Sequence, residues 1–130
     1  MTENEHPNAA LVRRLFSAFG RDPMVVAAAL ARDIVWRVPG STVMSGEYRG
    51  RRAVVEFLRR TGLETGGTYR SLLHTVFADD DWAVALYRAM GTRNGIDLDV
   101  EQALVMRISD GVLQDVTAVP LDSAFERFWA

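Results

Sequence analysis

The sequence contains neither cysteine nor lysine. Without cysteine, the protein cannot form disulfides, use a thiolate nucleophile, ligate an iron–sulfur cluster or bind zinc through sulfur. All 15 basic residues are therefore arginine, and they are scattered as short pairs such as Arg13-Arg14 and Arg59-Arg60. Because the net charge is −2 and no basic stripe is present, we expect no binding to nucleic acid.

Long hydrophobic runs are also absent. None approaches the roughly 18 residues that a membrane-spanning helix requires, and the polar, acidic start of the chain does not resemble a signal peptide. We therefore expect a cytoplasmic protein with no membrane contact. The chain has 130 residues without repeats or a linker, which predicts a single domain over 1–130 with a flexible segment at 1–7.

Hydrophobic residues recur at helical spacing in three segments of the first half. The first predicted helix spans about 8–20 and begins at Asn8 as N-cap. The second spans about 23–32 behind the N-cap Asp22, because proline is favoured at the first helical position. The third spans about 51–61 and ends at a glycine.

The remaining segments predict strands. Residues 33–38 alternate before a Pro-Gly stop, and the glycine-rich residues 40–50 are expected to form a loop. The second half is expected to be a meander of four strands, over residues 69–78, 82–93, 96–109 and 112–120, joined by turns at Asp79-Asp80-Asp81, Asn94-Gly95 and Asp110-Gly111.

Two-residue turns set the register of the strands that they join. The Asn94-Gly95 turn places Tyr87 opposite Gln102 and Arg88 opposite Glu101, an opposite-charge pair that favours this register. The Asp110-Gly111 turn places Met106 opposite Asp115. If Phe77 pairs with Trp82, then His74 lies opposite Ala85.

This register divides the sheet into two faces. One face combines small and apolar residues with isolated polar groups, a pattern typical of a ligand pocket; it comprises Leu72, His74, Val76, Ala83, Ala85, Tyr87, Gln102, Leu104, Met106, Asp115 and Thr117. The other mixes large apolar residues with charges and is interpreted as a homodimer surface; it comprises Leu73, Phe77, Trp82, Val84, Leu86, Arg88, Glu101, Val105 and Arg107.

The order of elements, together with five local segments, resembles a known family. The chain resembles the SnoaL-like, ketosteroid-isomerase-related proteins of the nuclear transport factor 2-like superfamily over about residues 8–129. The segments that carry the resemblance are 15–22, 31–40, 46–50, 79–81 and 109–111. The resemblance implies an α+β fold, in which a cone-shaped, curved antiparallel sheet wraps around three helices of the N-terminal half and forms a small-molecule pocket.

The catalytic residues of this family are mostly not matched. The aspartate that serves as base in the isomerases corresponds to Val38, and their acidic oxyanion donor falls near Leu104. Their tyrosine on the first helix has no counterpart. The resemblance therefore implies a cavity, while classical steroid isomerisation by the same residues is not expected. A polyketide-cyclase activity, which needs one acid or base in an apolar cavity, remains open.

The candidate catalytic residues are His74, Asp115 and Tyr87. His74 among apolar neighbours would be a neutral base, although a core histidine with a hydrogen-bond partner is the alternative. Asp115 would be a second acid or base, or else a solvated or arginine-paired carboxylate. Tyr87 and Gln102 would hold a ligand carbonyl or an enolate, or simply bond to each other.

Further residues are expected to line the pocket or cover it. The lining candidates, which could equally be ordinary core or loop residues, are Trp36, Val38, Met44, Tyr48, Gln102, Leu104 and Met106. The aromatic residues Phe125, Phe128 and Trp129 lie in a short final helical turn capped by Asp122, and could close the pocket or anchor the C-terminal segment.

Three functions remain open at this stage. The first is a cofactor-independent isomerase or cyclase that acts by proton transfer on a hydrophobic carbonyl or polyketide-like compound. The second is a carrier or sensor of a hydrophobic small molecule, and the third is a dimeric interaction module. We expect no cofactor and no metal, because no histidine or carboxylate cluster has ligand spacing.

Overall fold

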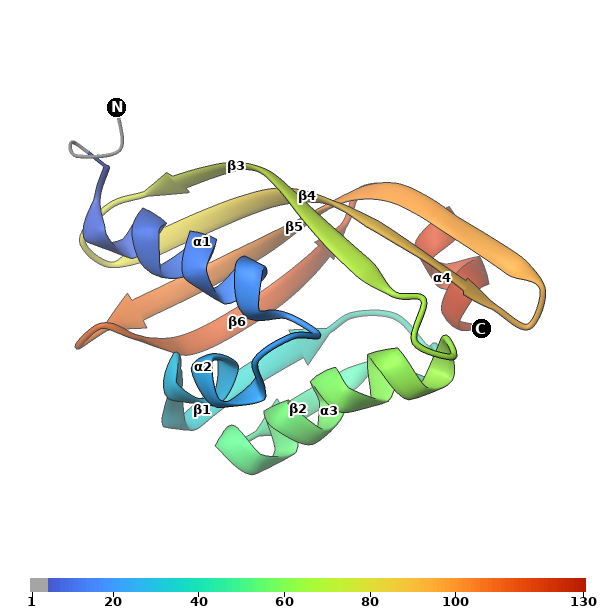
Figure 1. Cartoon of the computed structure of the whole chain (residues 1–130), viewed down its shortest axis with the longest axis horizontal. Coiled ribbons are helices and arrows are strands. Elements are labelled where there is room, and N and C mark those ends of the chain that lie inside the picture. The colour runs from blue at the N-terminus through green and yellow to red at the C-terminus, as the bar shows by residue number, and fades with distance from the viewer. Residues whose placement is uncertain (1–4) are drawn as a thin grey trace.

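The computed structural model describes residues 5–130, and its elements form a six-stranded, unclosed sheet with four helices (Figure 1). The strand order is β2-β1-β6-β5-β4-β3; β1 runs parallel to β6, and every other neighbouring pair is antiparallel. The predicted α+β class is confirmed.

The elements are α1 (Pro7–Ala18), α2 (Pro23–Ala28), β1 (Leu30–Val38), β2 (Gly46–Arg49), α3 (Arg51–Glu64), β3 (Arg70–Ala78), β4 (Trp82–Arg93), β5 (Ile96–Ser109), β6 (Val112–Pro120) and α4 (Ala124–Trp129).

The helix α1 begins two residues earlier than its N-cap signal suggested. Pro7 occupies the first turn and the side chain of His6 accepts a hydrogen bond from the backbone N–H of Asn8 at 3.1 Å, so the predicted cap at Asn8 is wrong. The predicted flexible segment 1–7 lies partly outside the described residues. Among those described, no helix has the length and hydrophobicity needed to span a membrane.

The helix α2 is capped as predicted but is shorter. The Asp22 carboxylate accepts from the backbone N–H of Val25 at 3.2 Å. The helix ends at Ala28 rather than near residue 32, because the chain from Leu30 onward pairs with β6, where Leu30 lies opposite Leu113. Strand pairing thus overrides the helical spacing of this segment.

Two boundaries around α3 also differ from the sequence prediction. The expected loop over 40–50 contains the strand β2, in which Tyr48 pairs with Trp36 of β1. The helix α3 passes through Gly62 and ends at Glu64, ahead of Gly66 and Gly67, whose φ angles of +58° and +81° suit glycine.

The strands β4, β5 and β6 have the predicted boundaries. Both turns between them have positive φ at both central positions, +52° and +77° at Asn94-Gly95 and +56° and +74° at Asp110-Gly111, as in a type I′ turn. The β4–β5 register is confirmed along its length, with Tyr87 opposite Gln102.

The predicted register of β3 against β4 is wrong in two respects: Phe77 pairs with Val84 rather than with Trp82, and a bulge lies further along the strand. Leu73 pairs with Tyr87 and Thr75 pairs with Leu86, so that His74 is the extra residue. An extra residue reverses the faces of the residues beyond it. The prediction that Leu72 and His74 face inward is therefore wrong, and Leu73 packs against the core instead of facing outward.

A second bulge lies in β6. Ile108 pairs with Leu113, but Arg107 pairs with Asp115, which leaves Gln114 as the extra residue. Asp115 therefore lies opposite Arg107 rather than opposite Met106 as predicted. Val116 takes the inward position opposite Met106.

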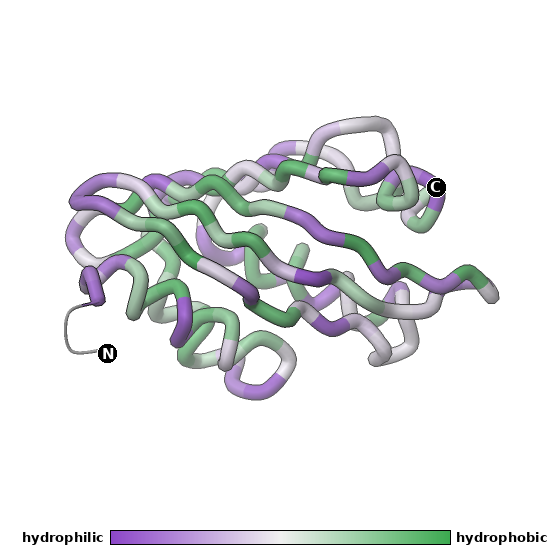
Figure 2. Tube along the Cα trace, turned by 90° about the horizontal axis from the view of Figure 1, so that it is seen from above, coloured by the Kyte–Doolittle hydropathy of each residue, from purple (hydrophilic) through white to green (hydrophobic). Residues whose placement is uncertain are grey.

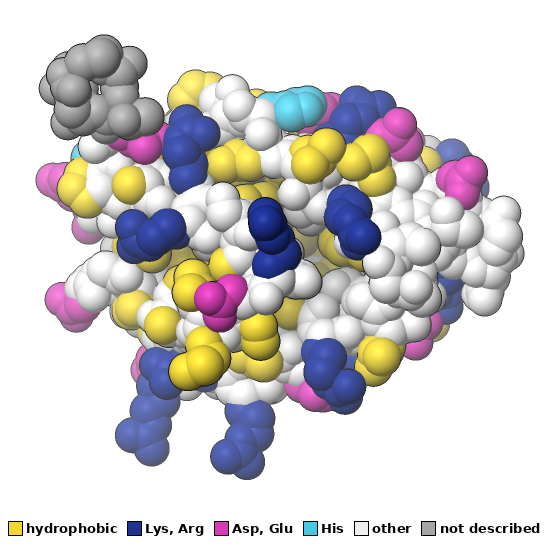
Figure 3. Space-filling model, in the orientation of Figure 1, with side chains coloured by type: hydrophobic (Ala, Val, Ile, Leu, Met, Phe, Trp, Pro, Cys, Tyr) yellow, Lys and Arg dark blue, Asp and Glu magenta, His cyan; other side chains and the backbone are white. Residues whose placement is uncertain are grey.

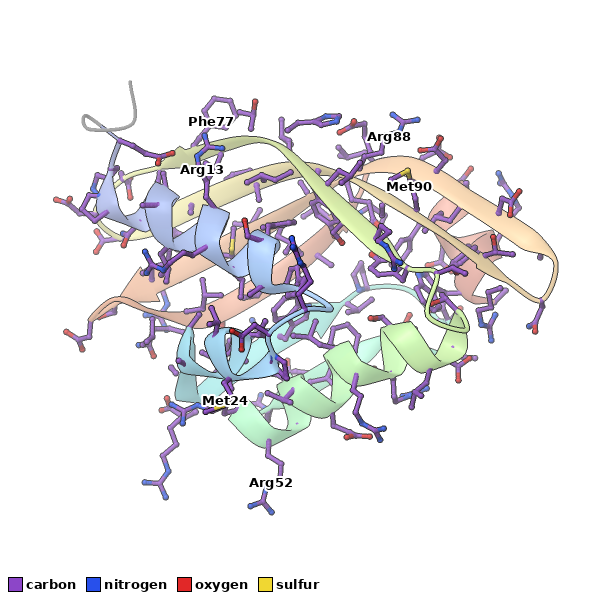
Figure 4. The ribbon with its side chains drawn as sticks, viewed as in Figure 1. Arg13, Met24, Arg52, Phe77, Arg88 and Met90 are labelled. Carbon is purple, nitrogen blue, oxygen red and sulfur yellow. The ribbon has the colours of Figure 1, made fainter. Side chains whose placement is uncertain are left out.

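Helices cover one face of the sheet. The helix α1 lies along β3 and β4, and α3 lies along β1 and β2 (Figure 1). Hydrophobic and hydrophilic residues alternate along the strands (Figure 2), so the hydrophobic core lies between sheet and helices. On the outer face the apolar side chains of Leu72, Phe77 and Trp82 are exposed, and Phe77 and Arg88 point away from α1 in Figure 4.

Candidate functional site

Tyr87 and Gln102 form a polar pair inside the apolar core. They lie opposite each other on β4 and β5, and only 5% and 1% of their surfaces are exposed. The Gln102 amide donates to the Tyr87 hydroxyl over a long 3.4 Å, which confirms that the two residues face each other. The amide oxygen of Gln102 has no hydrogen-bond partner among the described residues. An unpaired buried acceptor is unusual, because it costs about 1–3 kcal/mol.

Burial keeps the hydroxyl of Tyr87 protonated. Desolvation raises the pKa of Tyr87 well above its usual value, and the nearby Tyr69 phenol raises it further. The hydrogen bond from Gln102 acts in the opposite direction and lowers this pKa. Burial also raises the pKa of Tyr69. Both phenols are therefore neutral hydrogen-bond donors at physiological pH.

Apolar side chains surround this polar pair. Leu104 and Met106 follow Gln102 on the inner face of β5 and are almost completely buried, and the ring of Phe16 from α1 lies 5.2 Å from that of Tyr87. Because this environment has a low dielectric constant, a hydrogen bond formed here is strengthened.

The predicted lining residues on β1 and β2 also lie inside, where they pack against one another. Trp36 and Tyr48 flank Phe57 of α3 at 5.8 Å and 4.4 Å between ring centroids. The hydroxyl of Tyr48 donates to the backbone carbonyl of Met44 at 2.7 Å. Val38 and Met44 are buried in the same core.

His74 does not lie in this interior. Its side chain is 49% exposed on the outer face, and its Nδ1 lies 2.9 Å from a carboxylate oxygen of Glu101. The bulge in β3 is the reason for this position. Any acid–base chemistry by His74 would therefore take place on the outer face.

Asp115 also lies on the outer face. Its carboxylate accepts from the Arg37 guanidinium at 2.6 Å, and the same guanidinium donates to Glu47 at 3.0 Å. The arginine-paired alternative is thus confirmed, and the predicted inward position is wrong. An exposed pair of this kind contributes little to stability.

The interior offers hydrogen bonds but no strong base. Among residues 5–130, the buried polar or charged side chains other than tyrosine are Thr65 and Gln102. The hydroxyl of Thr65 donates to the carbonyl of Thr61 at 2.7 Å and is therefore satisfied. The unpaired polar atom that these buried residues offer to a ligand is the Gln102 amide oxygen, which lies beside the Tyr87 hydroxyl.

Two hollows among the described residues lie at the surface. One is lined by His6 and the 78–81 turn, where the Asp79 carboxylate accepts from the backbone N–H groups of Asp81 and Trp82. The other lies at the start of α3, between Arg32 and Arg52. Arginine side chains are scattered over the face shown in Figure 3 rather than gathered into a stripe.

Two residues of this region were missed by the sequence analysis. Tyr69 precedes β3 and interacts with the Tyr87 hydroxyl, and Arg93 at the end of β4 contacts the C-terminal helix. The position of Tyr69 depends on the β3 bulge, which has no local sequence signal. Arg93 adjoins the Asn94-Gly95 turn, where an exposed charge was the simpler expectation.

Comparisons with known proteins place the chain in a family. A protein of Mycobacterium tuberculosis, named as uncharacterised, is 33% identical over 123 residues, which cover 92% of this chain and 94% of that one. The solved structure of Bal32a, from a soil-derived mobile gene cassette, has a TM-score of 0.91 with 31% identity and covers 95% of this chain and 97% of its own.

A more distant neighbour shares the fold. The structure of a Jannaschia sp. CCS1 protein, whose name assigns it to the SnoaL-like polyketide cyclases, has a TM-score of 0.79 with 15% identity over 95% of this chain and 91% of its own. The SnoaL-like domain family itself matches residues 12–116. The chain therefore belongs to the SnoaL-like domain family, and it shares the fold of a nuclear transport factor 2-like protein of Burkholderia pseudomallei, with a TM-score of 0.84.

Proposed function

We propose that this domain binds a hydrophobic small molecule whose oxygen-bearing edge is held by Tyr87 and Gln102. The observation that carries the proposal is the unpaired amide oxygen of Gln102, a residue only 1% exposed. A ligand hydroxyl would donate to this oxygen, and a ligand carbonyl would accept from the neutral Tyr87 hydroxyl. The preferred ligand is thus apolar and carries a hydroxyl group beside a carbonyl group.

Family membership favours a second candidate, a cofactor-independent isomerase or cyclase. In such a reaction the Tyr87 hydroxyl, whose pKa burial raises, would donate to a developing enolate oxygen. Buried carboxylate and imidazole groups are lacking among residues 5–130, so this candidate requires a base from outside the interior. Binding is therefore the function that the geometry supports better.

A pair of probes tests the proposed site. The first is 5-hydroxy-1,4-naphthoquinone, which carries a hydroxyl and a carbonyl oxygen side by side and keeps its hydroxyl proton at neutral pH, and the second is naphthalene, which has the same ring skeleton without oxygens. Changing Tyr87 to Phe should weaken binding of the quinone about three- to tenfold, because one hydrogen bond is lost. Binding of naphthalene should be unchanged. Isothermal calorimetry or fluorescence quenching measures both.

A matched pair of variants tests Gln102. Gln102→Leu should weaken quinone binding, whereas Gln114→Leu, at the β6 bulge and outside the interior, should not. Gln102→Leu loses the long hydrogen bond to Tyr87 but also removes an unpaired buried acceptor, so these two effects oppose each other and the urea midpoint of unfolding should change little. Equal quinone affinity in all variants, or a severe loss of stability in Gln102→Leu, would show that Gln102 serves packing instead.

A further inference from the structure

The C-terminal helix α4 fills one end of the interior with aromatic side chains. Phe128 and Trp129 are 1% and 2% exposed, and their rings lie 4.8 Å apart. The Trp129 ring lies 5.9 Å from the ring of Tyr69, the phenol that interacts with the Tyr87 hydroxyl. In Figure 1, α4 lies at the end of the sheet opposite α2. The polar pair and the Trp129 ring are therefore linked through Tyr69.

The backbone beside α4 is adapted to Phe128 and Tyr69. Gly91 of β4 has no side chain, and a Cβ atom placed there would lie 3.6 Å from the Phe128 ring and 3.3 Å from the Cα of Tyr69. The strand thus leaves room for the Phe128 ring and for the backbone of Tyr69. The Trp129 ring itself contacts a second aromatic ring, that of Tyr69, and the Arg93 cation, which are the partners that a planar aromatic molecule prefers.

Few polar contacts hold α4 in place, and Arg93 makes two of them. Its guanidinium donates to the carbonyls of Phe128 and Ala130 at 3.1 and 2.9 Å, and it lies 6.0 Å above the Trp129 ring. The backbone N–H of Val43 donates to the Trp129 carbonyl at 3.1 Å. The helix has only six residues, so it has little stability of its own. Its N-cap residue is Ser123 rather than the predicted Asp122 and makes no side-chain capping bond, although the Asp122 carboxylate accepts from the backbone N–H of Ala124 at 2.8 Å.

We propose that Trp129 occupies the position of a planar aromatic ligand, and that α4 swings out when this ligand binds. The proposal rests on the proposed function, since it extends the Tyr87–Gln102 site toward Tyr69. The ligand ring replaces the indole against Tyr69, and oxygens on its edge reach Tyr87 and Gln102. The ligand class is thus a flat, hydroxylated aromatic carbonyl compound. Because the ligand binds only molecules in which α4 is undocked, the apparent affinity equals the intrinsic affinity multiplied by the undocked fraction.

A matched pair of tryptophan variants tests this proposal. Trp129→Ala removes the internal occupant and should tighten binding of both 5-hydroxy-1,4-naphthoquinone and naphthalene about fivefold or more. Trp82→Ala is the control, because Trp82 is 48% exposed on the outer face, and its affinities should match those of the wild type. Unchanged or weaker binding in Trp129→Ala, with native circular dichroism, would overturn the proposal.

A second variant keeps a complete core. Arg93→Met removes the contacts to the α4 carbonyls and should also tighten binding of both probes. In this variant, trypsin should cleave faster after Arg127 of α4 and release residues 128–130. Cleavage after the exposed Arg21, between α1 and α2, is the internal reference for this rate. Mass spectrometry follows both cleavages. The quinone should likewise accelerate cleavage of the wild-type protein after Arg127; slower or unchanged cleavage contradicts displacement of α4.

The two proposals can fail separately. Tighter naphthalene binding in Trp129→Ala and faster cleavage in Arg93→Met require only that α4 is displaceable. Weaker quinone binding in Tyr87→Phe requires only that the ligand oxygen contacts Tyr87. If the tyrosine variant has an effect and the α4 variants have none, the site stands and the displacement is refuted.

Discussion

The alkaline stability of the protein should report the buried phenol of Tyr87. The chain contains no lysine and no cysteine, and arginine stays protonated in proteins, so the side chains that titrate near pH 10 are its three tyrosines. Folding raises the pKa of Tyr87 through burial. As the pH rises, the unfolded chain therefore releases this proton first, and the free energy of unfolding falls above about pH 10.

The size of this effect follows from linkage. Tyr87 is 5% exposed, and its raised pKa means that the folded state keeps the proton in this range. The phenol has a pKa of about 10 in the unfolded chain. Loss of this proton on unfolding therefore lowers the free energy of unfolding by about 1.4 kcal/mol at pH 11 and by less than about 0.1 kcal/mol at pH 9. Tyr69, whose pKa burial also raises, adds a loss in the same direction.

Urea unfolding at pH 7, 9 and 11, followed by circular dichroism, measures this loss for the wild type and for Tyr87→Phe. The variant should be less stable at pH 7, because it loses a hydrogen bond with Gln102. Between pH 9 and 11, however, it should lose about 1.4 kcal/mol less than the wild type. Parallel curves for the two proteins would refute the argument that Tyr87 is held neutral by burial.

Three other predictions concern the core, the outer face and the two predicted acid–base residues, His74 and Asp115. Leu113→Ala should lower the free energy of unfolding by about 2–5 kcal/mol in urea titrations, because Leu113 is fully buried. The chain, of 14.5 kDa, should sediment as a homodimer through the outer face, and Phe77→Glu, at a residue 61% exposed there, should give monomers; a monomeric wild type contradicts this. Asp115→Asn and His74→Ala should leave quinone affinity unchanged, and a loss in either would place the ligand on the outer face.

The parts of the site that could be predicted are those next to short turns. The Asn94-Gly95 turn fixes the β4–β5 register without interruption, so Tyr87 and Gln102 were paired correctly from the sequence. The pairing holds seven residues from the turn, because no bulge intervenes. A resemblance to a family was not needed to place these two side chains.

The parts that could not be predicted depend on two bulges. His74 and Gln114 are the extra residues, and neither is a glycine or a proline that would mark an irregular strand. Each bulge turns a predicted acid–base residue outward, His74 itself in β3 and Asp115 in β6. The same bulge in β3 brings Tyr69 and Leu73 to the core side of the sheet. Strict alternation of inward and outward side chains along this strand places both residues on the outer face instead.

These two bulges decide which chemistry the interior can support. The positions where the isomerase acids of the resembled family fall hold Val38 and Leu104, which are 6% and 3% exposed and belong to the core. His74 and Asp115, the predicted acid–base residues, lie on the outer face. The described part of the interior therefore combines the neutral phenols and the Gln102 amide with apolar side chains. Such a site distinguishes ligands by hydrogen-bond pattern, because an unmatched polar group there is costly. Among residues 5–130, none of the buried side chains is a carboxylate or an imidazole, which is why the proposed function is recognition of an oxygenated hydrophobic molecule.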